Sequence, residues 1–276
     1  MIIISGRNAE QVINQLPLTG LERKIAMGKM NSPVAYRYDS PEALQFELTT
    51  RQSIVNAARA LQASDAAFAI FEKSYCNLRY WTRTANGGFQ LNPGVRPSDA
   101  INDIFRNGDK YGFECATAIV IIWYKAVLDV VGETVFNAYF NNLYLRDWNH
   151  DSDLWLISTH SSDESYPGDV LYFKNPDYDK DTPEWQGENV VLLDDNLYFG
   201  HGIGIESGED IIRSLNKMRE PGSTRSAHLS DLVVYPNFEN LRRLAARITA
   251  ELEEEVSQLA DTRSIMSVIG SKQVFQ

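Results

Sequence analysis

The chain contains a run of uncharged, mostly apolar residues from 116 to 123, and a cysteine, Cys115, directly precedes it. A helix without a charge on any side must be surrounded by other elements, so this run predicts a buried helix near the centre of the fold. Asp109 is a short hydrogen-bond acceptor ahead of the run, and we interpret it as the N-cap. Cys115 then lies in the first turn, where unpaired N–H groups and the helix dipole favour the reactive thiolate.

Composition limits the classes of function. The chain has 276 residues and a formal net charge of -11, so nucleic acids and anionic membrane surfaces would repel it, and neither is expected as a partner. The two cysteines, Cys76 and Cys115, lie outside any metal-site pattern and form no disulfide framework, so we expect no metal and no cofactor.

The N-terminus has no basic region ahead of its short apolar run, and no uninterrupted apolar stretch is long enough to span a bilayer. We therefore expect no signal peptide and a protein kept in the reducing interior of a cell.

The order of the predicted elements indicates an α+β fold, with helices first and a mostly antiparallel sheet later. Apolar side chains fall at helical spacing after the cap Ser40 and the first helical residue Pro41, and a further helix begins at Pro97. Gly132 separates the buried helix from another one over 133–143. Further interpretations are a strand followed by loop over 1–19, helix over 21–30 and 64–71, loop over 85–97, strands over 170–174, 188–193, 197–206 and 229–235, either strand or helix over 209–215, and amphipathic helix from 238 onward.

The predicted hairpin around residues 194 and 195 brings two polar side chains together. If these two residues form the centre of the turn, Glu188 and His201 are directly opposed and share a face, with β-carbons about 5 Å apart. A turn centred one residue later would shift this register. A neutral imidazole needs a partner to fix its tautomer, and a carboxylate serves well.

If this sheet packs on the buried helix, Cys115, His201 and Glu188 form a nucleophile, a base and a group that orients the base. The alternative is an inert, packed thiol and an unrelated surface Glu–His pair, and spacing alone does not decide between the two. His160 and His228 lie in polar segments without a strand to hold them, and they are weaker candidates.

Three motifs make the sequence resemble known families. Tyr-Pro-Gly-Asp-Val-Leu-Tyr-Phe over 166–173 and Phe-Gly-His-Gly-Ile-Gly-Ile over 199–205 are similar to the Pro-Gly-Asp and histidine strands of the papain-like NlpC/P60 superfamily. More closely, Gly-Phe-Glu-Cys-Ala-Thr-Ala over 112–118, Trp-Gln-Gly-Glu-Asn-Val-Val over 185–191 and Tyr-Phe-Gly-His-Gly over 198–202 resemble the spore-coat transglutaminases of Bacillus and its relatives.

The second resemblance implies an enzyme that forms ε-(γ-glutamyl)lysine cross-links without calcium. Cys115 would be the nucleophile, His201 the base and acid, and Glu188 the orienting group, with Glu114 next to the thiol as an assistant. The fold implied is a papain-like core in a single catalytic domain over 1–245, followed by a C-terminal helical extension over 246–276.

Transfer to an amine requires a site shielded from water. Trp185 is the first candidate for an apolar wall that binds substrate, and Trp148 and Phe68 are weaker ones. Backbone N–H groups at the helix start would stabilise the oxyanion. Partners would be glutamine- and lysine-bearing spore-coat proteins, after synthesis in the mother-cell cytoplasm. The alternatives are a cysteine peptidase or amidase of the NlpC/P60 kind and a non-catalytic coat or scaffold protein.

Overall fold

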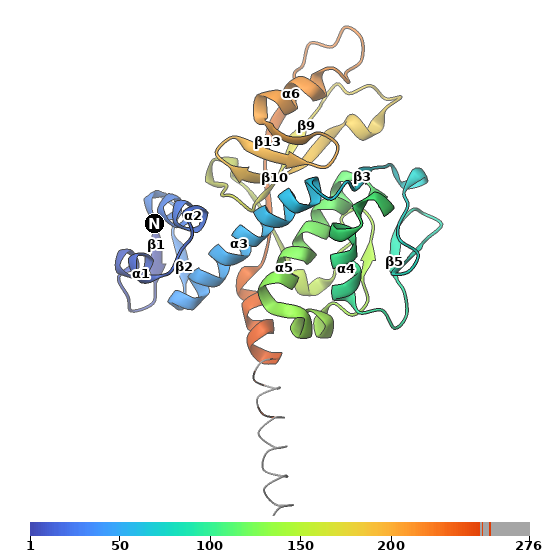
Figure 1. Ribbon diagram of the computed structural model, residues 1–276. Helices are drawn as coiled ribbons and strands as arrows, with labels where there is room; N and C mark the ends of the chain where they lie inside the picture. Colours follow the sequence, from blue (N-terminus) through green and yellow to red (C-terminus); the bar gives the residue numbers. More distant parts are fainter. Residues whose placement is uncertain (249, 251–253, 255–276) are drawn as a thin grey trace, which may run out of the picture.

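The computed structural model describes residues 1–248, 250 and 254 and has an antiparallel six-stranded sheet above a group of helices (Figure 1). The strands lie in the order β12-β11-β10-β9-β13-β8. Because every neighbouring pair is antiparallel and most helices precede the sheet in sequence, the predicted α+β class is confirmed. The strands are β8 Leu156–His160, β9 Val170–Lys174, β10 Gly187–Asp194, β11 Leu197–Gly200, β12 Gly204–Ser207 and β13 His228–Pro236.

Three helices form the layer under the sheet: α3 Pro41–Gln62, α4 Pro97–Arg106 and α5 Cys115–Tyr139. Helix α5 packs on both α3 and α4, and its side chains from 116 to 124 are buried, as the charge-free run predicts. The start of α3 also agrees with prediction, because Ser40 accepts a hydrogen bond from the N–H of Ala43 at 3.2 Å and Pro41 is the first helical residue.

A small N-terminal unit has its own apolar cluster and contains β1 Ile2–Ile4, α1 Ala9–Gln15, α2 Gly20–Asn31 and β2 Tyr36–Tyr38. Buried charges connect this unit to the rest of the fold. Glu47 pairs with Lys29 of α2 and with Arg51 one turn along α3, and Arg51 donates to Asp169 at 2.7 Å. The Pro-Gly-Asp turn is therefore held to α3 by an ion pair whose side chains are almost completely buried.

The remaining elements are short. Strands β3 Ala67–Phe68 and β6 Gly112–Phe113 pair in parallel, and β4 Trp81–Arg83, β5 Phe89–Leu91 and β7 Tyr144–Leu145 form a small antiparallel sheet. Helix α6 Gly208–Asn216 lies beside the large sheet (Figure 1). Single 3-10 turns occur at Phe71–Lys73, Gly108–Lys110, Ser152–Leu154, Ser162–Glu164 and Pro183–Trp185.

Several local predictions were wrong, each because a tertiary contact decides the conformation. The helix expected over 64–71 is a turn and strand, since β3 pairs with β6. The loop expected over 85–97 contains β5, and the loop expected before residue 19 contains α1. The long strand expected over 197–206 is the β11–β12 hairpin. The undecided segment over 209–215 is helical, capped by Ser207.

Gly132 has non-helical backbone angles, φ 81° and ψ 162°, so α5 consists of two helical segments that meet at this residue, as predicted, and the second ends at Tyr139. Within the described residues α5 is the one helix long and apolar enough to cross a membrane by length and composition, although Lys125 and Asp129 interrupt its apolar residues, and 67% of its most apolar window is buried inside the fold. Most of the predicted extension over 246–276 lies outside the described residues, so the domain boundary stays a prediction.

Candidate active site

Cys115 is the first residue of α5, and the residue before it caps the helix. The carboxylate of Glu114 accepts hydrogen bonds from the N–H groups of Ala116 at 2.9 Å and Thr117 at 2.8 Å. The predicted N-cap Asp109 is wrong, because it belongs to a 3-10 turn and strand β6 separates it from the helix. Two of the amide groups that normally stabilise negative charge at a helix start, those of Ala116 and Thr117, are therefore occupied by a carboxylate.

This environment reverses the predicted acidity of the thiol. Burial raises the pKa of Cys115 above its usual range, and the negative charges of Glu188 and Glu114 act in the same direction. The amide of Asn189 opposes this shift, because its Nδ2 lies 3.5 Å from the sulfur as a donor. The neutral thiol is therefore the favoured form, and a reaction at the sulfur requires a group that accepts its proton.

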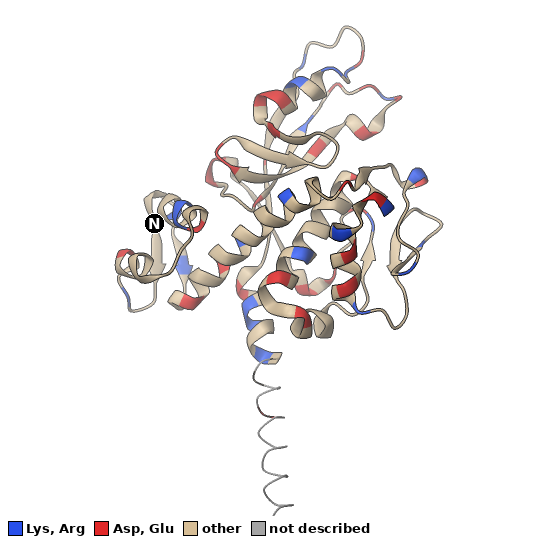
Figure 2. Ribbon diagram, viewed as in Figure 1, with Lys and Arg blue, Asp and Glu red and all other residues tan. Residues whose placement is uncertain are grey.

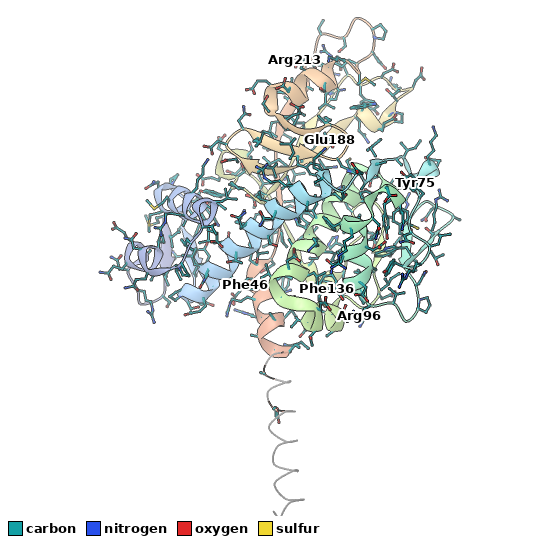
Figure 3. All side chains as sticks on the ribbon, in the orientation of Figure 1. Phe46, Tyr75, Arg96, Phe136, Glu188 and Arg213 are labelled. Carbon is teal, nitrogen blue, oxygen red and sulfur yellow. The ribbon has the colours of Figure 1, made fainter. Side chains whose placement is uncertain are left out.

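Glu188 is a buried carboxyl group whose charge acts on the Cys115 thiol, and it lies where the sheet meets the helices (Figure 3). Its exposed fraction is 4%, and its Oε1 has no hydrogen-bond partner among the described residues. Burial raises the pKa of Glu188 to about 8, and the charge of Glu114 adds to the effect. Gly200 makes room for this group, since a β-carbon there would lie 2.8 Å from the Glu188 Oε1.

The register of the β10–β11 hairpin differs from the predicted one. Val190 lies opposite Gly200, so the turn is centred one residue later, on 195–196, and a bulge precedes it. The pairing ends at Gly200, and the chain then turns toward β12. Glu188 and His201 are therefore not a directly opposed pair, although the backbone of His201 is near enough to the carboxyl group to lower its pKa slightly.

The imidazole of His201 contacts other groups. Its Nε2 lies 3.2 Å from the carbonyl oxygen of Ala67, and its ring stacks on Phe113 with centroids 4.6 Å apart. Burial lowers the pKa of His201 to about 4, so the ring is neutral at neutral pH. Among the described residues, the hydrogen bonds of this ring are to backbone carbonyl groups, and it makes none to Cys115 or Glu188.

Two cavities lie on either side of Phe68. Cys115 lines the larger one, whose volume is about 970 Å³ and whose wall includes strands β8, β9, β10 and β13. His201 lines the smaller one, of about 250 Å³. Phe68 belongs to both walls and is 38% exposed. The side chains lining the larger cavity that carry a charge are all carboxylates, from Glu72, Glu114, Asp147, Asp181 and Glu184.

The predicted substrate-binding residues differ in position. Phe68 and Trp148 line the larger cavity. Trp185 does not line it, and its indole packs instead against the second apolar cluster of the sheet. The 3-10 turn at Pro183–Trp185 explains this, because the flanking Pro183 and Gln186 face the cavity while the third residue of the turn points away.

The two weaker histidine candidates are at the surface. His160 and His228 are exposed, although each lies at the end of a strand, contrary to the expectation that no strand holds them.

Sequence reasoning missed one contact of the thiol. Asn189 was not among the candidates, yet its side chain is the hydrogen-bond donor to Cys115. The motif over 185–191 contains it, so its position next to Glu188 was the available signal.

Comparison with known proteins shows the family of the chain that carries this thiol site. The sequence model of the protein-glutamine gamma-glutamyltransferase family matches residues 1–245. The chain belongs to this family. A protein-glutamine gamma-glutamyltransferase of Halalkalibacterium halodurans is 47% identical over 213 residues, which cover 77% of this chain and 75% of the relative. One from Bacillus cereus strain B4264 is 38% identical over 252 residues, 91% of each chain.

A solved transglutaminase from Geobacillus stearothermophilus, lacking its C-terminal extension, has 50% sequence identity and a TM-score of 0.71. The similarity covers 74% of this chain and 97% of that chain. The resemblance seen in the motifs is thus confirmed at the level of the family and the enzyme class. Members of a transglutaminase family act on protein glutamine and lysine side chains, and the same holds for this chain.

Proposed function

We propose that Cys115 carries the acyl group during cross-linking of protein glutamine to protein lysine, and that the reaction needs no calcium. The observation that supports this most directly is the placement of the thiol. Cys115 opens helix α5 at the wall of a large cavity and is contacted by a side-chain amide. A protein glutamine could reach the sulfur through such a cavity without entry of the whole polypeptide.

In the first step the proton of the Cys115 thiol moves to Glu188. The two groups influence each other electrostatically, and burial raises the pKa of each, so the reaction begins in the molecules whose Glu188 carboxyl group is ionised while the thiol holds its proton. A carboxyl group with a pKa of about 8 exchanges a proton readily near physiological pH. The role of base predicted for His201 has less support, because the imidazole lines the other cavity and its pKa is about 4.

The sulfur then attacks the γ-carboxamide carbon, and the C=O electron pair moves to the oxygen. When the C=O bond re-forms, the C–N bond breaks, and the nitrogen leaves as ammonia with the proton that Glu188 had accepted. A lysine ε-amine attacks the thioester in the same manner and transfers a proton to Glu188. The C–S bond then breaks, and the sulfur takes that proton from Glu188, which restores the thiol and the carboxylate. The products are the isopeptide and the free enzyme, so atoms and charges balance.

The surroundings of the sulfur favour an amine over water in the second step. Phe68 and Trp148 cover apolar parts of the cavity and limit the entry of water. The carboxylates that line the same cavity attract a lysine-bearing segment. Acidic and basic residues are interspersed over the rest of the fold (Figure 2), whereas the charged side chains that line the cavity are all acidic.

The finer parts of the proposal are the place of action and the cation requirement. We propose the spore coat as the site of cross-linking and coat proteins as substrates, following synthesis in the mother cell. These parts are supported by the resemblance of the three motifs to spore-coat transglutaminases.

The test replaces Cys115 with alanine and measures incorporation of dansylcadaverine into casein, with and without EGTA. We expect incorporation by the natural protein in both buffers, and loss of at least about a thousandfold in Cys115→Ala. Cys76→Ser, which changes the buried second cysteine, is the matched control and should retain activity. Retained incorporation by Cys115→Ala would refute the role of the thiol, and loss in EGTA would refute calcium independence.

A further inference from the structure

The negative charge that develops during acyl transfer needs a hydrogen-bond donor. In many thiol enzymes this donor is a backbone N–H group at the start of the nucleophile's helix. Here the N–H groups of Ala116 and Thr117 donate to the carboxylate of Glu114, and the Thr117 hydroxyl donates to it as well. These two amides of the helix start are therefore already bonded to a carboxylate, and the expectation that helix-start amides hold the oxyanion stays a prediction.

Asn189 supplies a donor from the opposite wall. It lies in β10, where it pairs with Tyr172 of β9, and its side chain lines the same cavity as Cys115. The Asn189 Nδ2 lies 3.5 Å from the sulfur, and its backbone N–H also acts on the sulfur in the direction of lower thiol pKa. The sheet thus fixes this amide in position before substrate arrives.

The bonding of Asn189 differs from that of a structural asparagine. Asn175 is an example of the latter, since its Nδ2 donates to the carbonyl groups of Trp185 and Leu215 and so holds two segments together. The side-chain hydrogen bond of Asn189 goes instead to the sulfur of Cys115.

We propose that Asn189 is a catalytic residue whose side-chain amide stabilises negative charge first on the Cys115 sulfur and then on the oxygen of the tetrahedral intermediate. The inference rests on the proposed function, which makes Cys115 the nucleophile. An oxygen bonded to the carbon that the sulfur has attacked remains within reach of the same amide. No proton leaves Asn189 in either step, so it acts as a fixed donor while Glu188 carries the proton.

The first experiment measures the rate at which iodoacetamide alkylates Cys115 from pH 6 to pH 10. Peptide mass spectrometry assigns the label to this residue and separates it from Cys76. In Asn189→Ala the apparent pKa of the thiol should rise by about one unit, so alkylation at pH 7 slows about tenfold. Asn189→Asp is nearly isosteric and adds a third carboxylate near the sulfur, so its profile should move further. Asn175→Ala should unfold at lower temperature but keep the natural alkylation profile.

The second experiment measures incorporation of dansylcadaverine into casein. Asn189→Ala should lower kcat by about a hundredfold with little change in KM for the amine, because the lost interaction forms in the transition state. Natural kcat and a natural alkylation profile in both Asn189 variants would overturn the assignment. A shifted alkylation profile without amine incorporation by the natural protein would reject the proposed function but keep the contact between Asn189 and the thiol.

Discussion

Replacing Glu188 with glutamine should make the stability of the protein less dependent on pH. Glu188 is 4% exposed, and burial raises its pKa from 4.5 to about 8. The folded state therefore binds the Glu188 proton more tightly than the unfolded state does. This stabilisation is complete below pH 4.5, where both states are protonated, and it is lost as the pH rises through the folded-state pKa of about 8.

The magnitude follows from these two pKa values. At pH 5 the tighter proton binding contributes about 4 kcal/mol to the free energy of unfolding, and at pH 8 it contributes less than about 1 kcal/mol. The free energy of unfolding of the natural protein, relative to Glu188→Gln, should therefore fall by about 3 kcal/mol between pH 5 and pH 8. This window lies below the ordinary pKa of an unfolded cysteine, so ionisation of Cys115 contributes little.

Urea unfolding followed by circular dichroism at several pH values measures this difference. The subtraction of one variant from the other cancels the titration of all groups that the two share. Glu206→Gln, at an exposed position of β12, is the matched control and should change the free energy of unfolding by less than about 0.5 kcal/mol at every pH. A difference between the natural protein and Glu188→Gln that is the same at pH 5 and pH 8 would refute the reasoning.

Two further substitutions test the framework around the site. Arg51→Met leaves the buried carboxylates of Glu47 and Asp169 without their shared partner. It should lower the free energy of unfolding, measured in urea, by about 3–5 kcal/mol. A loss below about 1 kcal/mol would contradict the importance of this ion-pair network. Gly200→Ala places a β-carbon 2.8 Å from the Glu188 Oε1. Because this contact displaces the carboxyl group, kcat for amine incorporation should fall at least about tenfold. An unchanged kcat would show that the reaction does not require Glu188 in its present position.

The fold and much of the site could be predicted because some signals are local. The charge-free run predicted the burial of α5, and Ser40 with Pro41 predicted the start of α3. The order of helical and strand patterns predicted the α+β class. Each of these depends on side-chain spacing or on a few consecutive residues.

The chemistry of the site could not be predicted in the same way. A shift of one residue in the hairpin turn removed the direct pairing of Glu188 with His201, and the packing of β3 and β6 directed the imidazole to the carbonyl of Ala67. The acidity of Cys115 was predicted with the wrong sign. Desolvation and the nearby carboxylates raise the thiol pKa, whereas the sequence indicated only a helix start.

The sequence by itself determined the α+β class, the buried helix and the family to which the chain belongs. The tertiary structure alone decided which groups hold protons and which amide faces the sulfur. The physical reason is range: helix and strand periodicity depends on neighbouring residues, while desolvation and donor geometry depend on atoms brought together from distant segments, as Asn189 is brought to Cys115.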